Sequence, residues 1–414
     1  MRTHAVFGLI GAGGLGQSQH LPNLNRARNV ILKSVCDLNP EFLELVKTKY
    51  DVAHVTQDHR ELLADPEIDA IVIATRADAH IPLAIEALRA GKHVYVEKPL
   101  AETADECERL LPIQRASGRL LAVGHNRRMA PAFQMLRKVL RAHGGARNIH
   151  YRITDDLYLW GPEAGVEPGT RVVHEVCHIF DLLRYLADSE VASIYCAASR
   201  PDDEIIALRF ESGCVATIMS SGCMTRDMPK ERLEVVVDIG GAIVEEFVEL
   251  RTFGLTDFEP VYRFPGRIHP DFDMMHRYLF EKQGAQAMMD LRRIFWEKTQ
   301  RLEELERSGE QSVERRELEQ YLHVNAPSCN YMVDKGWQAS VEHLADCILH
   351  GTPCELSTAE DGLRAAMLSQ AAIDSRNSGQ VVRTMFAPHV KPAEPKLEVT
   401  VTKLPGHRPR VVAK

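Results

Sequence analysis

The amino-acid sequence predicts an α/β protein in which an open, doubly wound parallel sheet is followed by an α+β part with an open, mainly antiparallel sheet. Two observations support this prediction. Short, β-branched apolar runs alternate with helical patterns over residues 4–124, as expected for a βαβ series with buried parallel strands. Residues 191–250 instead carry short strand-like runs in direct succession, which is typical of antiparallel sheets.

The first part is expected to form a domain over residues 1–124. Residues 79–90 have apolar side chains at helical spacing and are followed by Gly91, a residue type that commonly ends a helix. Helices of this kind between parallel strands cover both faces of the sheet. The expected strands are the apolar runs 5–10, 30–36, 70–74, 93–96 and 120–124.

The second part is expected to form an α+β domain over residues 125–387. The pattern changes at about residue 148, and a helix is expected at about 173–187. Short runs separated by turns then indicate an antiparallel sheet. The expected strands are residues 191–198, 203–210, 213–220, 231–238 and 241–250.

Two segments stand apart from these domains. An insertion at about 265–330 contains residues 290–320, which are rich in Glu, Arg, Gln and Leu, with a break at Ser308-Gly309. This composition predicts a charged helical hairpin, either a solvated insertion or a contact between subunits or a lid. Residues 388–414 are rich in Pro and in basic residues, so we expect an extended tail.

Composition and charge narrow the class of protein. The chain has 414 residues, with 50 Lys and Arg against 58 Asp and Glu, and a net charge of −8; this balance argues against nucleic acid as a partner. No apolar run approaches the roughly 20 residues of a membrane span, and the apolar stretch at 5–10 is too short for a signal peptide. Nine scattered Cys without a Cys-x-x-Cys pair indicate reduced thiols and a cytoplasmic location.

A glycine-rich segment fits the pattern G-x-G-x-x-G directly after the first apolar run. Gly11 allows a tight turn, Gly13 lets the backbone approach a pyrophosphate, and Gly16 permits close packing of helix on strand. The helix that follows favours negative phosphates at its N-terminus. The alternative is a turn with a purely structural purpose. The residues expected to cradle a dinucleotide are Gly11, Gly13, Gly14, Leu15 and Gly16.

Asp37 ends the second apolar run, 21 residues beyond Gly16. A carboxylate at this place accepts hydrogen bonds from a ribose 2′-hydroxyl and repels a 2′-phosphate. The sequence therefore favours NAD over NADP. Asp37 also precedes Asn39-Pro40, so the alternative is a cap at a helix N-terminus, and one residue can serve both purposes.

Four further segments carry a family resemblance. Residues 97–100 read Glu-Lys-Pro-Leu after an expected strand, residues 90–94 read Ala-Gly-Lys-His-Val, and residues 123–128 read Val-Gly-His-Asn-Arg-Arg. Residues 178–184 read His-x-x-Asp-Leu-Leu-Arg. With the glycine motif, these segments resemble the Gfo/Idh/MocA oxidoreductases, a family named for glucose–fructose oxidoreductase, inositol dehydrogenase and a rhizopine-catabolism protein.

The resemblance covers residues 4–260 and 336–383, and it implies a Rossmann domain followed by a domain with an open sheet used for oligomerisation, hence a homodimer or homotetramer. It implies hydride transfer between NAD and a ring carbon of a sugar, sugar derivative or cyclitol. Lys98 and His178 would handle the proton, with a cis peptide before Pro99. The implied cofactor contacts are Thr75, His80, Glu97, Lys98 and Asn126.

His174 departs from the family pattern, which has Asp four residues before the catalytic histidine. In a regular helix, His174, His178 and Asp181 would share one face. A histidine gains or loses a proton near pH 7, so His174 is expected to assist Lys98 and His178. An additional base also suits an NAD-dependent glycoside hydrolase, which works by transient oxidation, elimination, water addition and re-reduction. That reaction is the first alternative function.

Residues 174–178 also fit the H-E-x-x-H pattern of zinc proteases. A zinc metalloprotease is therefore a remote alternative, with Glu175 activating water. No third ligand follows in the sequence, so no metal is expected. A non-catalytic NAD-sensing protein is a further alternative.

Several polar and aromatic residues are expected to contact a small-molecule carbohydrate or cyclitol. Arg128 follows the last strand of the first domain, where it would face the cleft or pair with a surface acid. Residues 229–235 and 334–336 resemble one branch of the family, although the charges at Lys230 to Arg232 are expected to be solvated. The candidate substrate contacts are Arg128, Tyr158, Trp160, Glu175 and Asp181.

Overall fold

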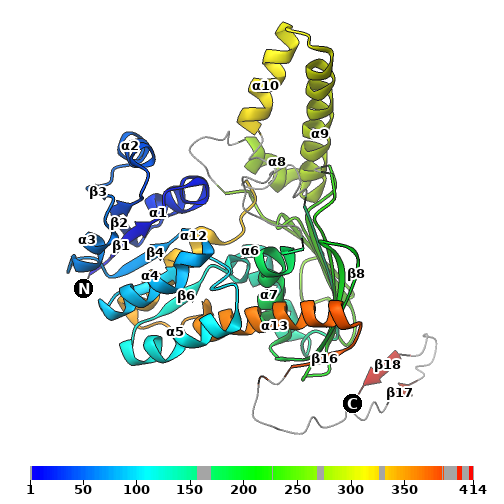
Figure 1. The fold of residues 1–414 in the computed structure, drawn as a ribbon. Coiled ribbons are helices and arrows are strands. Elements are labelled where there is room, and N and C mark those ends of the chain that lie inside the picture. Colours follow the sequence, from blue (N-terminus) through cyan, green and yellow to red (C-terminus); the bar gives the residue numbers. More distant parts are fainter. Residues whose placement is uncertain are drawn as a thin grey trace.

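Both expected sheets are present in the structure, a computed structural model (Figure 1). None of the helices it describes is at once long and apolar enough to cross a membrane. The structure describes residues 2–155, 169–225, 227–267, 275–325, 332–384, 386, 399–402 and 410–413.

The N-terminal sheet has seven strands in the order β15-β6-β5-β4-β1-β2-β3, and all pairs except β15–β6 are parallel. The Rossmann architecture is thereby confirmed, and the short β3 is a strand that the sequence did not predict. The strands from the first part of the chain are β1 (Ala5–Ile10), β2 (Val30–Cys36), β3 (His54–Thr56), β4 (Ala70–Ile73), β5 (His93–Val96) and β6 (Leu121–Val123).

Helices connect these strands and cover both faces of the sheet (Figure 1). The first connection begins with a π-helical turn, η1, rather than with regular α-helix. The helical segments are η1 (Gly16–His20), α1 (Leu21–Arg26), α2 (Pro40–Lys49), α3 (His59–Ala64), α4 (Ala77–Arg89) and α5 (Ala104–Ser117).

The late part of the chain returns to this sheet. Helix α12 (Trp337–His350) buries Val341 and Leu344 in the same core as Phe7 and Leu9 of β1. Strand β15 (Ser357–Thr358) then pairs antiparallel with β6. Both elements come from the range 125–387 that was expected to form the second domain, and they pack on the first sheet.

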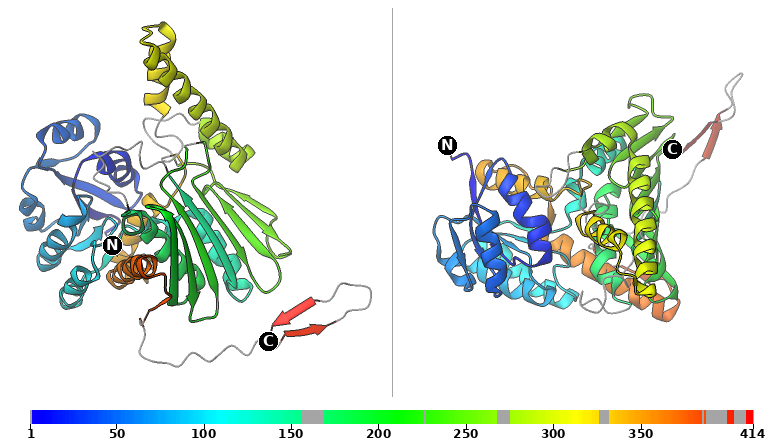
Figure 2. Two further views of the ribbon diagram at one scale, coloured as in Figure 1. Left: turned by 45° about the vertical axis from the view of Figure 1, so that its right-hand side comes forward. Right: turned by 90° about the horizontal axis from the view of Figure 1, so that it is seen from above.

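The second sheet has nine strands in the order β14-β13-β12-β11-β7-β10-β9-β8-β16 (Figure 2). The mainly antiparallel arrangement is confirmed, with β7 and β10 as a parallel pair at its centre. The strands are β7 (Asn148–Thr154), β8 (Val191–Arg200), β9 (Asp203–Phe210), β10 (Val215–Ser221), β11 (Glu231–Val236), β12 (Gly241–Glu245), β13 (Glu249–Phe253), β14 (Val261–Arg263) and β16 (Val382–Arg383).

Two details of this sheet differ from the expectation. Residues 241–250, expected as one strand, form β12 and the start of β13, because Glu246 and Phe247 adopt positive φ and turn the chain. Strand β7 was not expected, yet it lies inside the sheet. Its alternation of exposed and buried residues is the pattern of a strand with one buried face.

Helix α13 (Ala359–Ser378) joins the two sheets. Its first half packs Ala359 and Leu363 into the core beside α5, and its second half packs Leu368 and Ala372 into the core of the second sheet. Its N-terminus carries a capping box, in which Thr358 and Asp361 satisfy each other's backbone amides. The helices α6 (Pro131–Ala142) and α7 (Cys177–Ala187) complete that second core.

The expected charged hairpin is present as α9 (Ala285–Ser308) and α10 (Val313–Asn325). These helices follow α8 (Met275–Gln283) in the chain and project from the body of the protein (Figure 1). Gly309 ends α9 in the left-handed conformation, at the expected break. In the tail, β17 (Val399–Thr402) and β18 (Arg410–Ala413) pair antiparallel. The tail outside these strands lies mostly beyond the described residues, so the expectation of an extended tail stays a prediction.

Candidate active site

The glycine motif forms a tight loop directly after β1. Gly11 has φ of +103°, and a Cβ there would lie 2.4 Å from the Ala74 carbonyl oxygen; a Cβ on Gly16 would lie 2.5 Å from the Gly11 oxygen. Both positions therefore require glycine. A Cβ on Gly13 or Gly14 would instead meet nothing within 4 Å. This open space above the loop fits the pyrophosphate of a dinucleotide.

Asp37 lies beside the loop at the carboxyl end of β2. Its Oδ2 accepts a hydrogen bond from the Ala12 amide at 2.6 Å, and its Oδ1 accepts one from the Asn39 amide at 2.8 Å. The carboxylate thus holds the glycine loop through Ala12, and it also lies next to the expected dinucleotide site. The helix cap itself belongs to Asn39, whose side chain accepts from the Glu41 amide.

The residues expected to contact the cofactor beyond the loop have internal partners. His80 is buried, with Nδ1 2.8 Å from the Pro99 oxygen and Nε2 3.2 Å from the Thr75 oxygen. It therefore holds the end of β4 against the cis Lys98–Pro99 peptide. The Asn126 amide group donates to the Lys335 carbonyl at 2.7 Å.

Glu97 is also buried, and it pairs with His20 from η1. The His20 Nε2 and Glu97 Oε1 lie 2.9 Å apart. Burial alone would raise the pKa of Glu97, but His20 and Lys98 outweigh it and lower the pKa below its ordinary value. A Cβ at Gly124 would lie 2.8 Å from the carboxylate, so the glycine of the Val-Gly-His segment makes room for Glu97.

Lys98 extends from the end of β5 towards the start of α7. Its Nζ donates to the backbone carbonyl of His174 and lies 3.4 Å from Glu175 Oε2. The side chain is 21% exposed. Lys98 therefore stands at the carboxyl edge of the parallel sheet, where ligands of this architecture bind.

His174 and His178 have different surroundings. A π-helical turn, η5 (Val172–Val176), precedes α7, and it breaks the regular spacing on which a shared face depends. The His174 Nε2 lies 3.8 Å from Glu102 Oε1, whereas the buried His178 ring packs edge-on against His125 at 5.7 Å. His178 and Asp181 both lie in α7 and both contact His125, so the expectation of a common face is wrong for His174 alone.

A group of buried charges lies behind Lys98. The Glu231 carboxylate lies 2.8 Å from the Arg127 guanidinium and 3.0 Å from the Lys335 amine. The Glu175 carboxylate lies 3.3 Å from the Arg127 guanidinium and 3.5 Å from the Lys230 amine. We call these five residues the buried charge cluster. The expectation that Lys230 and Glu231 are solvated is wrong, because they are only 8% and 3% exposed.

The buried charge cluster sets the electrostatics of the site. Burial would raise the pKa of Glu175, but Lys230, Lys98 and Arg127 outweigh it and hold the pKa well below its ordinary value. Burial, followed by the positive charges of Arg127 and Lys98, holds the pKa of His178 well below its ordinary value. His178 is therefore neutral at pH 7, while Glu175 is an anion.

Comparison with known proteins agrees with this arrangement. The model of the NAD-binding Rossmann-fold oxidoreductase family, GFO_IDH_MocA, matches residues 6–125. The uncharacterized oxidoreductase YrbE of Bacillus subtilis is 31% identical over 234 residues, which cover 53% of this chain and 68% of that protein. The chain belongs to the Gfo/Idh/MocA oxidoreductase family. It is an NAD(P)-dependent oxidoreductase.

Other relatives and solved structures extend the likeness. Inositol 2-dehydrogenase of Acidothermus cellulolyticus is 33% identical over 199 residues, covering 47% of this chain and 57% of that protein. Scyllo-inositol dehydrogenase of Lactobacillus casei, solved with NAD(H) and scyllo-inositol, has a TM-score of 0.65 at 15% identity, covering 92% of this chain and 99% of that one. An oxidoreductase of Agrobacterium radiobacter has a TM-score of 0.71 at 16% identity, covering 92% and 98%. At these identities the solved structures establish the fold alone.

Arg128 and Asp181, expected as substrate contacts in this Gfo/Idh/MocA protein, bind each other instead. Two hydrogen bonds of 2.5 and 2.7 Å join the guanidinium to the carboxylate. Asp181 also accepts from Ser357 at 2.9 Å, and the pair is buried. Their contacts tie α7 to the chain around β15, so we leave both residues out of the proposed substrate contacts. Tyr158 and Trp160 lie outside the described residues.

Sequence reasoning missed three parts of this oxidoreductase site: Lys335, the buried state of Lys230 and Glu231, and the pairing of His20 with Glu97. The resemblance of residues 229–235 and 334–336 to one branch of the family was the available signal for Lys335 and for the buried Lys230 and Glu231. No local pattern distinguishes a buried Lys-Glu pair from a solvated one, because the partners come from distant strands and helices.

Proposed function

We propose that this enzyme oxidises a ring hydroxyl of a cyclitol, sugar or sugar derivative, with Lys98 and His178 handling the hydroxyl proton. Support comes from the site and from relatives named inositol 2-dehydrogenase. The observation that carries the proposal is the position of Lys98 at the carboxyl edge of the parallel sheet, in contact with anionic Glu175 and near neutral His178.

NAD, when bound over the glycine loop, supplies the nicotinamide that takes the hydride. Asp37 beside the loop supports NAD over NADP, because a carboxylate repels a 2′-phosphate. The chain's own contribution is to hold the substrate hydroxyl at Lys98 Nζ. Glu175 and the His174 carbonyl orient that amine, and a neutral imidazole at His178 is able to accept a proton.

Neither alternative reaction is favoured by the site. The His174 ring, which suited glycoside cleavage, faces Glu102, and only its backbone carbonyl contacts Lys98. For a zinc protease, Glu175 would have to act as a base, but it is surrounded by Lys98, Arg127 and Lys230. Cations at these positions would also repel Zn²⁺.

A Lys98→Met variant tests the proposal. NADH formation from a panel of inositols and free sugars, read by absorbance at saturating NAD, should fall about 10²–10⁴-fold. Lys138→Met, which alters an exposed lysine on α6, is the matched control. A Lys98→Met enzyme with the full rate would refute the assignment, as would release of an aglycone from glycosides without net NADH.

We further propose that the protein forms a homodimer or homotetramer through the outer face of the nine-stranded sheet. Alternate residues of neighbouring strands place apolar side chains on this face, each at least 40% exposed, and an apolar patch of this kind marks an association surface. Light scattering should report a mass above that of one chain. The cytoplasmic location stays a prediction. The exposed side chains are Tyr195, Ile205, Val215, Val236 and Phe253.

A further inference from the structure

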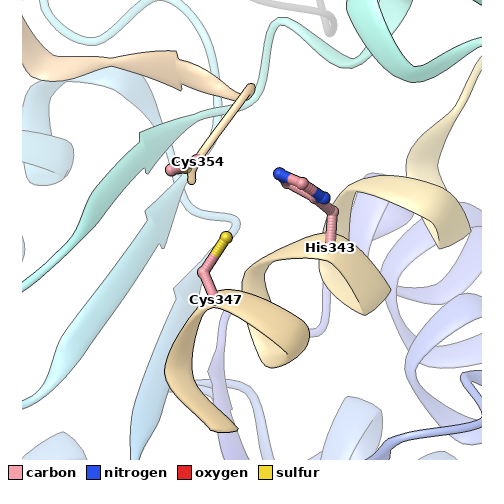
Figure 3. A group of neighbouring side chains, drawn as sticks. All are labelled: His343, Cys347 and Cys354. Atoms are coloured by element: carbon pink, nitrogen blue, oxygen red, sulfur yellow. The ribbon is translucent and has the colours of Figure 1, made fainter. Parts of the chain in front are cut away.

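Helix α12 carries two metal-binding side chain types on one face, away from the site described above. His343 and Cys347 are four residues apart, so they lie one above the other on the helix. Figure 3 shows both side chains rising from α12 towards the segment that carries Cys354. Cys347 is 6% exposed, and His343 and Cys354 are half-buried.

The chain turns back after α12 and brings Cys354 to this face. Gly351 ends the helix with φ of +66°, and its amide donates to the Cys347 carbonyl at 3.0 Å. The Thr352 hydroxyl donates to the Asp346 carbonyl, also at 3.0 Å, which fixes the returning segment. One ligand atom from each of His343, Cys347 and Cys354 lies within 4.8 Å of the other two.

The imidazole of His343 faces the returning segment next to Cys354. Its Nε2 accepts a hydrogen bond from the Glu355 amide at 3.0 Å, so the lone pair of the ring is engaged by that amide. Metals bind histidine through such a neutral nitrogen, and ligation through Nε2 would exchange this hydrogen bond for a bond to the metal.

We propose that His343, Cys347 and Cys354 bind one Zn²⁺ ion, with a water molecule as the fourth ligand. Two thiolates and one imidazole form a soft N/S donor set that suits a tetrahedral ion of this kind. Binding releases the two thiol protons, since the thiolate is the ligand. The half-exposed side of the cluster leaves room for the water.

A bound ion would tie the C-terminal end of α12 to the segment that leads into β15. These are the two elements that return to the Rossmann sheet. Zn²⁺ would then act as a structural clamp on that sheet, because an ion that binds only the folded chain stabilises it. The proposal does not depend on the identity of the substrate.

Cobalt spectroscopy of the full chain tests the site. The reduced, metal-stripped protein is titrated with Co²⁺, and we expect a thiolate-to-cobalt charge-transfer band that saturates at one ion per chain. Addition of Zn²⁺ should abolish the band and raise Tm. The Cys354→Ser protein should show a charge-transfer band weaker by the contribution of one thiolate, and Zn²⁺ should no longer raise its Tm. Zn²⁺ should also no longer raise the Tm of the His343→Gln protein. Cys223→Ser, a half-buried thiol outside the cluster, should keep both signals.

Two results would overturn the proposal. One is a reduced protein that shows no charge-transfer band, or a band that Cys354→Ser leaves unchanged. The other is a Cys347–Cys354 disulfide that forms with oxidised glutathione in a protein that takes up no Co²⁺ when reduced; the two thiols would then be a redox pair. NADH formation is not used as a readout, so failure here is separate from failure of the proposed function.

Discussion

The buried charge cluster and the α9–α10 hairpin use the same residue types in opposite settings. In the cluster, Glu231 is 3% exposed and binds both Arg127 and Lys335. In the hairpin, Arg301 and Glu314 also form a close pair, 2.8 Å apart, but both side chains are nearly half exposed. The two ion pairs have the same distance, 2.8 Å, and they differ in how far their side chains are exposed to solvent.

The difference shows what each pair contributes. A buried ion loses its hydration, so its partners must compensate, and removal of one partner leaves an unpaired charge. An exposed pair keeps most of its hydration in either state. We therefore expect changes in the buried charge cluster to alter both the stability of the protein and the charge around Lys98. The exposed pairs of the hairpin should contribute mainly to solubility.

The largest effect is expected for Glu231→Gln. This change removes the carboxylate that both Arg127 and Lys335 contact and leaves Arg127 with Glu175, and it should lower the free energy of unfolding by about 3–5 kcal/mol. Urea unfolding followed by circular dichroism measures the loss. The double variant Glu231→Gln/Lys335→Met should recover part of it, because it also removes a buried cation that has lost its contact with Glu231. A loss below 1 kcal/mol would show that the cluster behaves like the surface pairs.

A smaller, pH-dependent effect is expected from Lys335. Burial lowers its pKa from 10.5 to about 8. Between these two values the unfolded chain holds a proton that the folded chain has lost, so this residue makes stability rise with pH. Relative to Lys335→Met, the wild-type protein should gain up to about 3 kcal/mol from pH 8 to pH 10.5. Urea titrations of both proteins across this range check it, and parallel curves would contradict it.

The smallest effect is expected for Glu314→Gln in the hairpin. The Arg301–Glu314 pair is solvated, so its loss should leave the midpoint of urea unfolding unchanged within error. The same measurement at high salt should also show no difference between variant and wild type, because salt screens exposed charges. A clear drop in the midpoint would mean that the hairpin is buried in an assembly.

The first domain could be predicted largely from sequence because its signals are local. The glycine loop and the apolar strands depend on neighbouring residues, and the structure places them as expected. The same holds outside this domain for the break at Gly309. The cis peptide before Pro99, which the family resemblance implied, is present. Short-range chemistry determines these features, so one sequence reveals them.

The parts that could not be predicted depend on distant partners. Arg128 was expected in the cleft, yet it binds Asp181, 53 positions away. Glu231 appeared to be a surface acid because Arg127 and Lys335, its partners, are each 104 positions away. The His343, Cys347 and Cys354 group lacks a familiar ligand spacing, and only the turn at Gly351 brings it together.

The return of α12 and β15 to the Rossmann sheet has a consequence during synthesis of the chain. The His125 ring and Ser357 hydroxyl, 2.8 Å apart in the folded protein, are separated by 232 positions in sequence. The edge of β6 therefore stays unpaired while β7 to β14 and the hairpin are still being translated. An open strand edge invites mispairing, so the nascent N-terminal domain is exposed to mispairing at this edge until residues 357 and 358 emerge.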